Sequence, residues 1–129
     1  MKLNHIALNV SNINDVIDFY QNILGFNKEY HFELPADLSY TLFGINKNLT
    51  FYFCKKEQVA FEIFILPESK NSGIAHICLE MPDRDKLITQ CLNKGYKVKN
   101  IQRDNKPNLL FVWDNSGNCF EIKEENFND

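Results

Sequence analysis

The order of apolar and polar residues along the chain predicts the same series of elements twice. Alternating polarity indicates a strand, and apolar residues at helical spacing indicate a helix. In the first half, the predicted elements occupy residues 3–10, 11–24, 26–34, 35–43, 49–54 and 59–66. In the second half, they occupy residues 74–81, 83–93, 96–102, 109–113 and 118–123. Each half therefore follows the order strand, helix, strand, strand, strand.

Local signals set the expected ends of these elements. Ser11 or Asn12 can cap the first long helix, and Gly25 can end it. Its apolar positions are Ile13, Val16, Ile17, Tyr20, Ile23 and Leu24, and those of the second helix are Leu87, Ile88, Cys91 and Leu92. The segment 35–43 is predicted to be a short helix, with a strand as the alternative. We expect one structural domain of two modules, 1–66 and 74–125, with a linker at 67–73 and a polar tail at 126–129.

A short phrase is repeated at the start of the two modules. His5-Ile6-Ala7-Leu8-Asn9 is echoed by His76-Ile77-Cys78-Leu79-Glu80, and both follow the pattern His-Ile-x-Leu-x. Each module also ends in an apolar strand that contains one glutamate, Glu62 in the first and Glu121 in the second. A single His on a strand is more often a structural residue than a ligand. The joint placement of the two His and two Glu residues in a repeat nevertheless indicates a functional site.

Strand alternation places these four side chains on corresponding faces. His76 shares a face with Cys78, and each glutamate lies opposite its apolar neighbours along its strand. If a helix covers one face of each sheet, the four groups project from the other face, and two such faces would form a cleft. Two imidazoles and two carboxylates suit one divalent metal ion, Ni²⁺, Co²⁺, Zn²⁺, Mn²⁺ or Fe²⁺. His5, Glu62, His76 and Glu121 are therefore the candidate metal ligands.

The motifs resemble those of the vicinal oxygen chelate superfamily. The opening His5–Val10, the segments Ile17-Asp18-Phe19-Tyr20 and Leu24-Gly25-Phe26, and the closing Trp113–Asn118 with Glu121 carry the resemblance. The superfamily includes glyoxalase I, methylmalonyl-CoA epimerase, extradiol dioxygenases, fosfomycin-resistance enzymes and bleomycin-binding proteins. The resemblance implies an α+β fold of paired βαβββ modules, with mixed curved sheets and helices on the outer face. It also implies a homodimer in which each metal site takes ligands from both chains.

The ligand pattern resembles bacterial glyoxalase I more than the other members. The pattern His, Glu, His, Glu implies a lyase or isomerase of the lactoylglutathione lyase type, acting by metal-stabilised enediolate proton transfer. The resemblance makes Glu121 the expected catalytic base, with Glu62 as the second candidate. Fosfomycin-type transferases and dioxygenases of this fold have no ligand at the position of Glu62, so they are the less favoured readings.

The expected substrate is a small molecule that chelates through two oxygens, and glutathione dependence is disfavoured. Glyoxalase I usually has a cation four residues after the first ligand, where this chain has Asn9. The segment after Glu62 is apolar, which favours a less polar ligand. Arg103, Lys106 and Lys123 are the remaining cations to consider, and the first two are expected to be solvated. The candidate substrate contacts are Asn9, Phe64, Leu66, Cys78 and Lys123.

Composition excludes several other classes. With a net charge of −3, the chain has no general attraction for nucleic acid or anionic membranes, and no apolar run approaches a membrane span. The four cysteines form no C-x-x-C pair, and the start carries no visible secretory signal, so a cytoplasmic protein with reduced thiols is expected. With 11 Phe and 5 Tyr, a non-catalytic protein that sequesters an antibiotic or metabolite remains an alternative.

Overall fold

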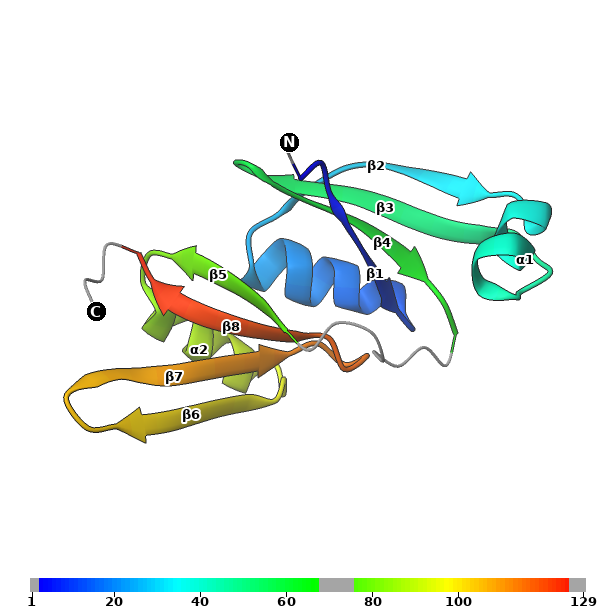
Figure 1. Ribbon diagram of the computed structural model, residues 1–129. Helices are drawn as coiled ribbons and strands as arrows, with labels where there is room; N and C mark the ends of the chain where they lie inside the picture. The colour runs from blue at the N-terminus through cyan, green and yellow to red at the C-terminus, as the bar shows by residue number, and fades with distance from the viewer. Residues whose placement is uncertain (1–2, 68–75, 126–129) are drawn as a thin grey trace. The chain divides into compact units, whose positions relative to one another are not determined.

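A computed structural model describes residues 3–67 and 76–125. The chain divides into two compact units, Met1–Ser69 and Lys70–Asp129. Each unit contains one four-stranded mixed sheet, and a long helix packs on one face of each sheet (Figure 1). The α+β class with paired βαβββ elements is thereby confirmed. Apart from Pro67, the predicted linker 67–73 lies outside the described residues, as does the tail 126–129.

Unit 1 has the sheet order β1-β4-β3-β2. Its elements are β1 (Ile6–Val10), η1 (Asp15–Ile23), β2 (Asn27–Leu34), α1 (Ala36–Phe43), β3 (Leu49–Lys56) and β4 (Val59–Ile65). Strand β1 pairs with β4 in parallel, and the other two pairings are antiparallel. The parallel pairing brings the first and last strands of the unit together, which places His5 near Glu62.

Unit 2 repeats this topology with the order β5-β8-β7-β6. Its elements are β5 (Ile77–Met81), α2 (Arg84–Asn93), β6 (Val98–Arg103), β7 (Lys106–Trp113) and β8 (Cys119–Glu124). Strand β5 is parallel to β8, and the remaining pairs are antiparallel. Strand β7 begins earlier than predicted and β6 ends one residue later, because a two-residue turn at Asp104 and Asn105 joins them.

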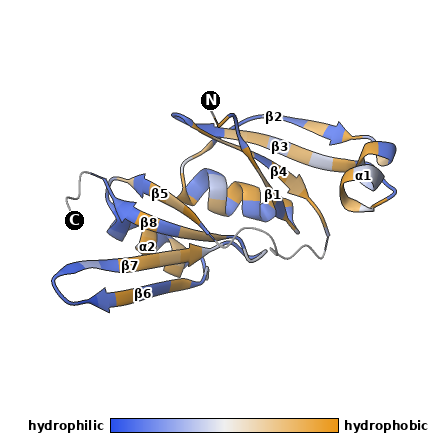
Figure 2. Ribbon diagram, in the orientation of Figure 1, coloured by the Kyte–Doolittle hydropathy of each residue, from blue (hydrophilic) through white to orange (hydrophobic). Residues whose placement is uncertain are grey.

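The core of each unit lies between its helix and the covered face of its sheet. In unit 2 this face presents Leu110, Val112, Phe120 and Ile122, all almost fully buried. The opposite face carries the alternate residues of the same strands, and these are only partly buried or exposed. Figure 2 shows hydrophilic and hydrophobic positions intermixed along these strands. Alternation along each strand therefore supplies one core face and one accessible face.

Helix η1 differs from the expected α-helix because it is a π-helix. Its last turn is wide, since Leu24 N–H donates to the Phe19 carbonyl five residues earlier. The wider turn buries pairs of residues at intervals of four: Asp15 with Val16, Phe19 with Tyr20, and Ile23 with Leu24. Ile17, predicted to face inward at α-helical spacing, is therefore exposed.

Two further local expectations are settled by the structure. The segment after Pro35 is a helix, α1, rather than a strand; Ala36 N–H donates to the Asn48 side chain, and Gly44 ends the helix in the left-handed conformation. In α2, Leu87 and Cys91 are buried, but Leu92 is exposed rather than inward. At its start, the side chain of Asp83 accepts a hydrogen bond from Lys86 N–H as an N-cap.

A candidate metal centre built from two histidine–glutamate pairs

The first pair of candidate ligands lies at the start of strand β1 and on strand β4 of unit 1. His5 directly precedes β1, and Glu62 is paired with Ala7, two residues further along. The imidazole reaches diagonally across the parallel pair, and its Nε2 lies 3.3 Å from Glu62 Oε1. The two side chains are 34% and 27% exposed. They are thus open to a ligand while being held by regular strand pairing.

The second pair repeats this geometry in unit 2. His76 directly precedes β5, and Glu121 is paired with Cys78, again two residues further along. His76 Nε2 lies 3.4 Å from Glu121 Oε1, and the side chains are 43% and 15% exposed. The sequence repeat therefore produces the same diagonal His–Glu contact twice, and Glu121 is the more enclosed of the two carboxylates.

An aromatic residue completes each pair, and sequence reasoning missed both. Phe53 is opposite Glu62 in the β3–β4 register and lies edge-on to His5, with ring centroids 6.4 Å apart. Phe111 is opposite Glu121 in the β7–β8 register and lies edge-on to His76, at 5.7 Å. Counting back from each glutamate through its hairpin turn would have identified them. These rings restrict the orientation of each imidazole.

A hydrogen bond also orients His5. Its Nδ1 lies 2.8 Å from Asn4 Oδ1. An amide oxygen only accepts, so Nδ1 is the donor in this contact, and Nε2 is the ring nitrogen that faces Glu62. Metal-binding histidines are commonly fixed in this way, with one nitrogen donating to an oxygen and the other free to coordinate.

The spacing within each pair fits two ligands of one metal ion. Ligands about 2.0–2.2 Å from a metal, at angles between about 90° and the tetrahedral angle, lie about 2.8–3.6 Å apart. The observed separations of 3.3 and 3.4 Å agree with this. Across residues 3–67 and 76–125, no group of three or more His, Cys, Asp or Glu is gathered for a metal. Each unit therefore presents two candidate donors at a spacing that one metal ion accepts.

The predicted substrate contacts fall into two environments. In unit 1, Asn9 is half-buried opposite Phe64 in the register, while Phe64 and Leu66 are buried in an apolar cluster with Leu49. In unit 2, Cys78 and Lys123 are exposed. In the first environment, Phe64 and Leu66 are enclosed by other apolar side chains. In the second, Cys78 and Lys123 are accessible, and Cys78 is paired with Glu121 in the register.

The thiols differ in accessibility. Cys78 is exposed, and partial burial followed by the charge of Glu121 raises its pKa. Burial raises the pKa of both Cys54 and Cys91 to about 11. Burial likewise raises the pKa of Cys119. All four thiols are therefore protonated near neutral pH, and all four are free cysteines.

Comparison with known proteins assigns the chain to a family. The model of the Glyoxalase/Bleomycin resistance protein/Dioxygenase superfamily matches residues 4–108, most of the chain. The protein belongs to this superfamily. The match includes the His5, Glu62 and His76 positions and ends before Glu121.

A curated relative is similar in sequence, and two solved structures share the fold. Methylmalonyl-CoA epimerase, mitochondrial, of Dictyostelium discoideum is 25% identical over 108 residues. That match covers 75% of this chain and 59% of the relative, so the chain spans little more than half of that protein. A glyoxalase family protein of Bacillus cereus superposes with a TM-score of 0.75 at 13% identity, covering 96% of this chain and 93% of the other. The trypanothione-dependent glyoxalase I of Leishmania major superposes with a TM-score of 0.72 at 18% identity, covering 97% of this chain and 87% of the other.

Proposed function

We propose that the protein is a metal-dependent lyase or isomerase that transfers a proton between adjacent carbons of a small oxygen-chelating substrate. The observation that carries this proposal is the repeated His–Glu diagonal, at the same register position and nearly the same distance in both units. His5, Glu62, His76 and Glu121 would together hold one divalent ion. Nickel, cobalt, zinc, manganese and iron all suit two imidazoles and two carboxylates.

The protein groups have separate roles in this reaction. A bound divalent metal would supply Lewis-acid polarisation of two neighbouring substrate oxygens. Glu121 is the proposed base, because it is the more enclosed carboxylate and is held at a fixed strand position beside Phe111. It would accept a proton at one carbon and return it to the next. Glu62 is the alternative base, and otherwise serves as a ligand.

The proposed substrate is not a glutathione conjugate. Asn9 stands where glyoxalase I usually has a cation, and Phe64 and Leu66, which follow Glu62, are apolar and buried. A glyoxalase-type reaction moves the proton to the adjacent carbon, as proposed. An epimerase-type reaction returns it to the same carbon, but it also begins by abstracting a proton next to a carbonyl group and is compatible with the His–Glu set. We further propose a cytoplasmic homodimer whose sites take His5 and Glu62 from one chain and His76 and Glu121 from its partner. The four free thiols support a reducing compartment.

Metal content provides the first test of this function. The untagged protein is stripped with chelator and reloaded with each of the five ions, and bound metal is measured by elemental analysis. We expect about one metal per chain, lost or strongly weakened in Glu121→Gln. Absence of binding by every ion would contradict the proposal. The loaded protein is then screened with α-hydroxy and α-keto compounds for exchange of the C–H proton with deuterium from solvent.

The Glu62→Gln variant separates this function from the related chemistries. If Glu62 is a ligand, proton exchange falls sharply in the variant. A three-ligand transferase or dioxygenase of the same fold would tolerate the change. Light scattering tests the dimer, and a monomeric mass in the active protein would exclude shared sites.

A second candidate function rests on the accessible face of unit 1. Tyr30 and Phe32 are 47% and 56% exposed there, and Tyr30 stacks on Phe53 with ring centroids 5.0 Å apart. Such a surface suits an aromatic antibiotic or metabolite. A protein that binds such ligands and holds none of the five metals would favour sequestration over catalysis.

A further inference from the structure

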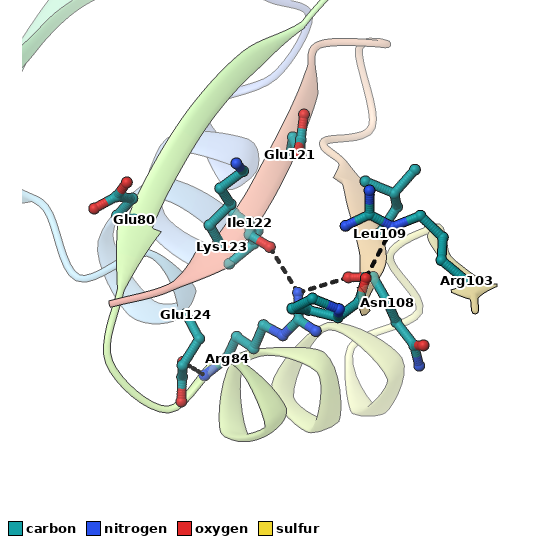
Figure 3. Close-up of a pocket in the computed structure, with 10 residues that line it drawn as sticks. Glu80, Arg84, Arg103, Asn108, Leu109, Glu121, Ile122, Lys123 and Glu124 are labelled. Carbon is teal, nitrogen blue, oxygen red and sulfur yellow. Dashed lines mark hydrogen bonds between the residues drawn. The ribbon is translucent and has the colours of Figure 1, made fainter. Parts of the chain in front are cut away.

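Strands β7 and β8 separate at one end, and the opening forms a pocket in unit 2. Their antiparallel pairing covers only three pairs and stops at Phe111 and Glu121, although β8 continues to Glu124 and β7 begins at Lys106. The pocket beyond this point has a volume of about 50 Å³, and Glu121 forms part of its wall (Figure 3). The candidate base therefore borders a cavity that its own unit forms.

Arg84 bridges the separated strands. From the first turn of α2, its Nη1 donates to the Asn108 carbonyl at 3.0 Å and to the Ile122 carbonyl at 3.2 Å, as the dashed lines in Figure 3 show. These contacts replace ladder hydrogen bonds that β7 and β8 do not make. A guanidinium has five N–H donors, and this one uses two of them within the described part of the chain. The guanidinium is thus held rigidly with donors to spare.

Arg103 and Lys123 bring two more cations to the same pocket. Arg103 Nε donates to the Pro107 carbonyl at 2.9 Å. Pro107 directly precedes Asn108, whose carbonyl accepts from Arg84. Arg103 is half-buried, so the expectation that it is simply solvated is wrong. Lys123 is two residues from Glu121 on β8. Among residues 3–67 and 76–125, none of these three cations forms an ion pair with a carboxylate.

The carboxylates of the pocket are otherwise engaged or exposed. Glu124 Oε2 accepts a hydrogen bond from Arg84 N–H at 3.0 Å, and Glu121 contacts His76. Glu80 is exposed at the β5 position opposite Lys123. Two guanidinium groups anchored on consecutive carbonyls therefore leave donors for an added anion. Planar guanidinium donors match carboxylate and phosphate oxygens, often in pairs.

Size and position match one anionic group of a small substrate. A cavity needs about 10–15 Å³ for each water molecule. The pocket volume of about 50 Å³ therefore admits a few waters or one carboxylate or phosphate. Along a strand, two residues span about 6.6 Å. Lys123 is accordingly within a few bond lengths of a carbon held at Glu121.

We propose that this pocket binds the carboxylate or phosphate of an anionic substrate whose reacting carbons lie at Glu121. The substrate role rests on the proposed function, and it narrows the substrate to an oxygen chelator that carries a second, anionic group several bonds from the reacting carbon. Arg84 and Arg103 provide directed donors, and Lys123 provides a mobile charge nearer the reacting end.

Titration of the full-length, metal-free protein tests the pocket directly. Inorganic phosphate and succinate are added separately at constant ionic strength, and the Nε–Hε signals of the arginine side chains are followed by NMR. We expect saturable shifts at Arg84 and Arg103. Arg103→Gln and Lys123→Gln should each weaken binding roughly tenfold or more, as expected for a lost charged hydrogen-bond donor. The tighter of the two probes identifies the preferred anion.

A matched control removes a charge from the same hairpin. Lys106 lies on β7 outside the pocket lining, so Lys106→Gln should bind both probes as the native protein does. Equal responses in all three variants, or the same shifts with sodium chloride alone, would overturn the proposal. Arg84 is left unchanged because its bridging role makes loss of folding a competing explanation.

The experiment separates this proposal from the proposed function. Because the titration uses metal-free protein, it does not depend on the four ligands. Metal binding without saturable anion binding would overturn the pocket alone. Anion binding that depends on Arg103 and Lys123 in a protein that holds no metal would overturn the proposed function and, with it, the substrate role.

Discussion

The two units share a topology and a His–Glu diagonal but differ in almost everything around it. In unit 1, β3 and β4 pair without interruption from Phe51 to Lys56, and aromatic rings cover the accessible face of the sheet. In unit 2, β7 and β8 pair briefly and then separate around Arg84. The parallel pairing of the first and last strands keeps the His–Glu contact the same in both units. The other two strands of each sheet differ, and so do the residues around the contact.

These surroundings suggest that the two units contribute differently to substrate recognition. The rings of unit 1 offer apolar contact, and the cations of unit 2 offer charge. Under the proposed function, both units contribute equally to metal binding and unequally to substrate recognition. The predictions below test that equality first and then the differences.

The largest effect is expected from the histidines. His5→Ala and His76→Ala should each reduce bound metal from about one to below about 0.1 per chain, because each pair supplies half of the donors. His31→Ala is the matched control, since its ring lies against Tyr52 rather than a glutamate and metal should be retained. Elemental analysis of the three variants decides this. Full metal content in either His5→Ala or His76→Ala would mean that the pairs do not act together.

Removing the bridge in unit 2 should destabilise the protein. Arg84→Gln leaves the carbonyls of Asn108 and Ile122 without their donor, and we expect a loss of about 2–3 kcal/mol in the free energy of unfolding. Lys86→Gln on the same helix should change it by less than about 0.5 kcal/mol. Urea unfolding measures both. Equal values for the two variants would show that the separated strands do not need Arg84.

The glycines that follow the two long helices allow a direct comparison between units. Gly25 and Gly95 both have left-handed φ values, 81° and 78°. A Cβ at Gly25 would also lie 3.1 Å from Lys56 Nζ, which donates to the Leu24 carbonyl, whereas nothing lies within 4 Å of one at Gly95. We expect losses of about 1–2 kcal/mol for Gly25→Ala and about 1 kcal/mol for Gly95→Ala.

Thermal or urea unfolding measures these two losses. Gly44→Ala, with a similar φ and open space, is the control and should match Gly95→Ala. A smaller loss at position 25 than at 95 would mean that the Lys56 contact imposes no added strain.

A pH-dependent effect concerns the buried thiols, one in each unit. Burial raises the pKa of Cys54 and of Cys91 to about 11, from 9.0. Between these values the folded state holds a proton that the unfolded state releases, so the stabilisation present below pH 9 is lost as pH rises toward 11. Unfolding free energies at pH 8 and 10.5 should show the decline. Cys54→Ala and Cys91→Ala should each flatten it, and an unchanged slope in both would contradict the assignment.

The pattern of the sequence was sufficient for the elements and for the internal repeat. Alternation identified the strands that carry Glu62 and Glu121 and the strands that His5 and His76 directly precede, because side-chain direction along a strand has a period of two. Glycine and proline marked most of the ends of helices and strands, because each acts on the backbone at its own position. These features depend on neighbours within a few residues, and the sequence contains them directly.

Only the tertiary structure decided the features that depend on backbone hydrogen bonding. The register of the β3–β4 and β7–β8 pairs put Phe53 and Phe111 beside the histidines. The wide turn of η1 exposed Ile17 and buried Phe19. Arg84, Arg103 and Lys123 line one pocket because β7 and β8 separate, and Lys106 lies outside it. The order of apolar and polar residues specifies neither the exact register of two strands, nor where they part, nor the width of a helical turn.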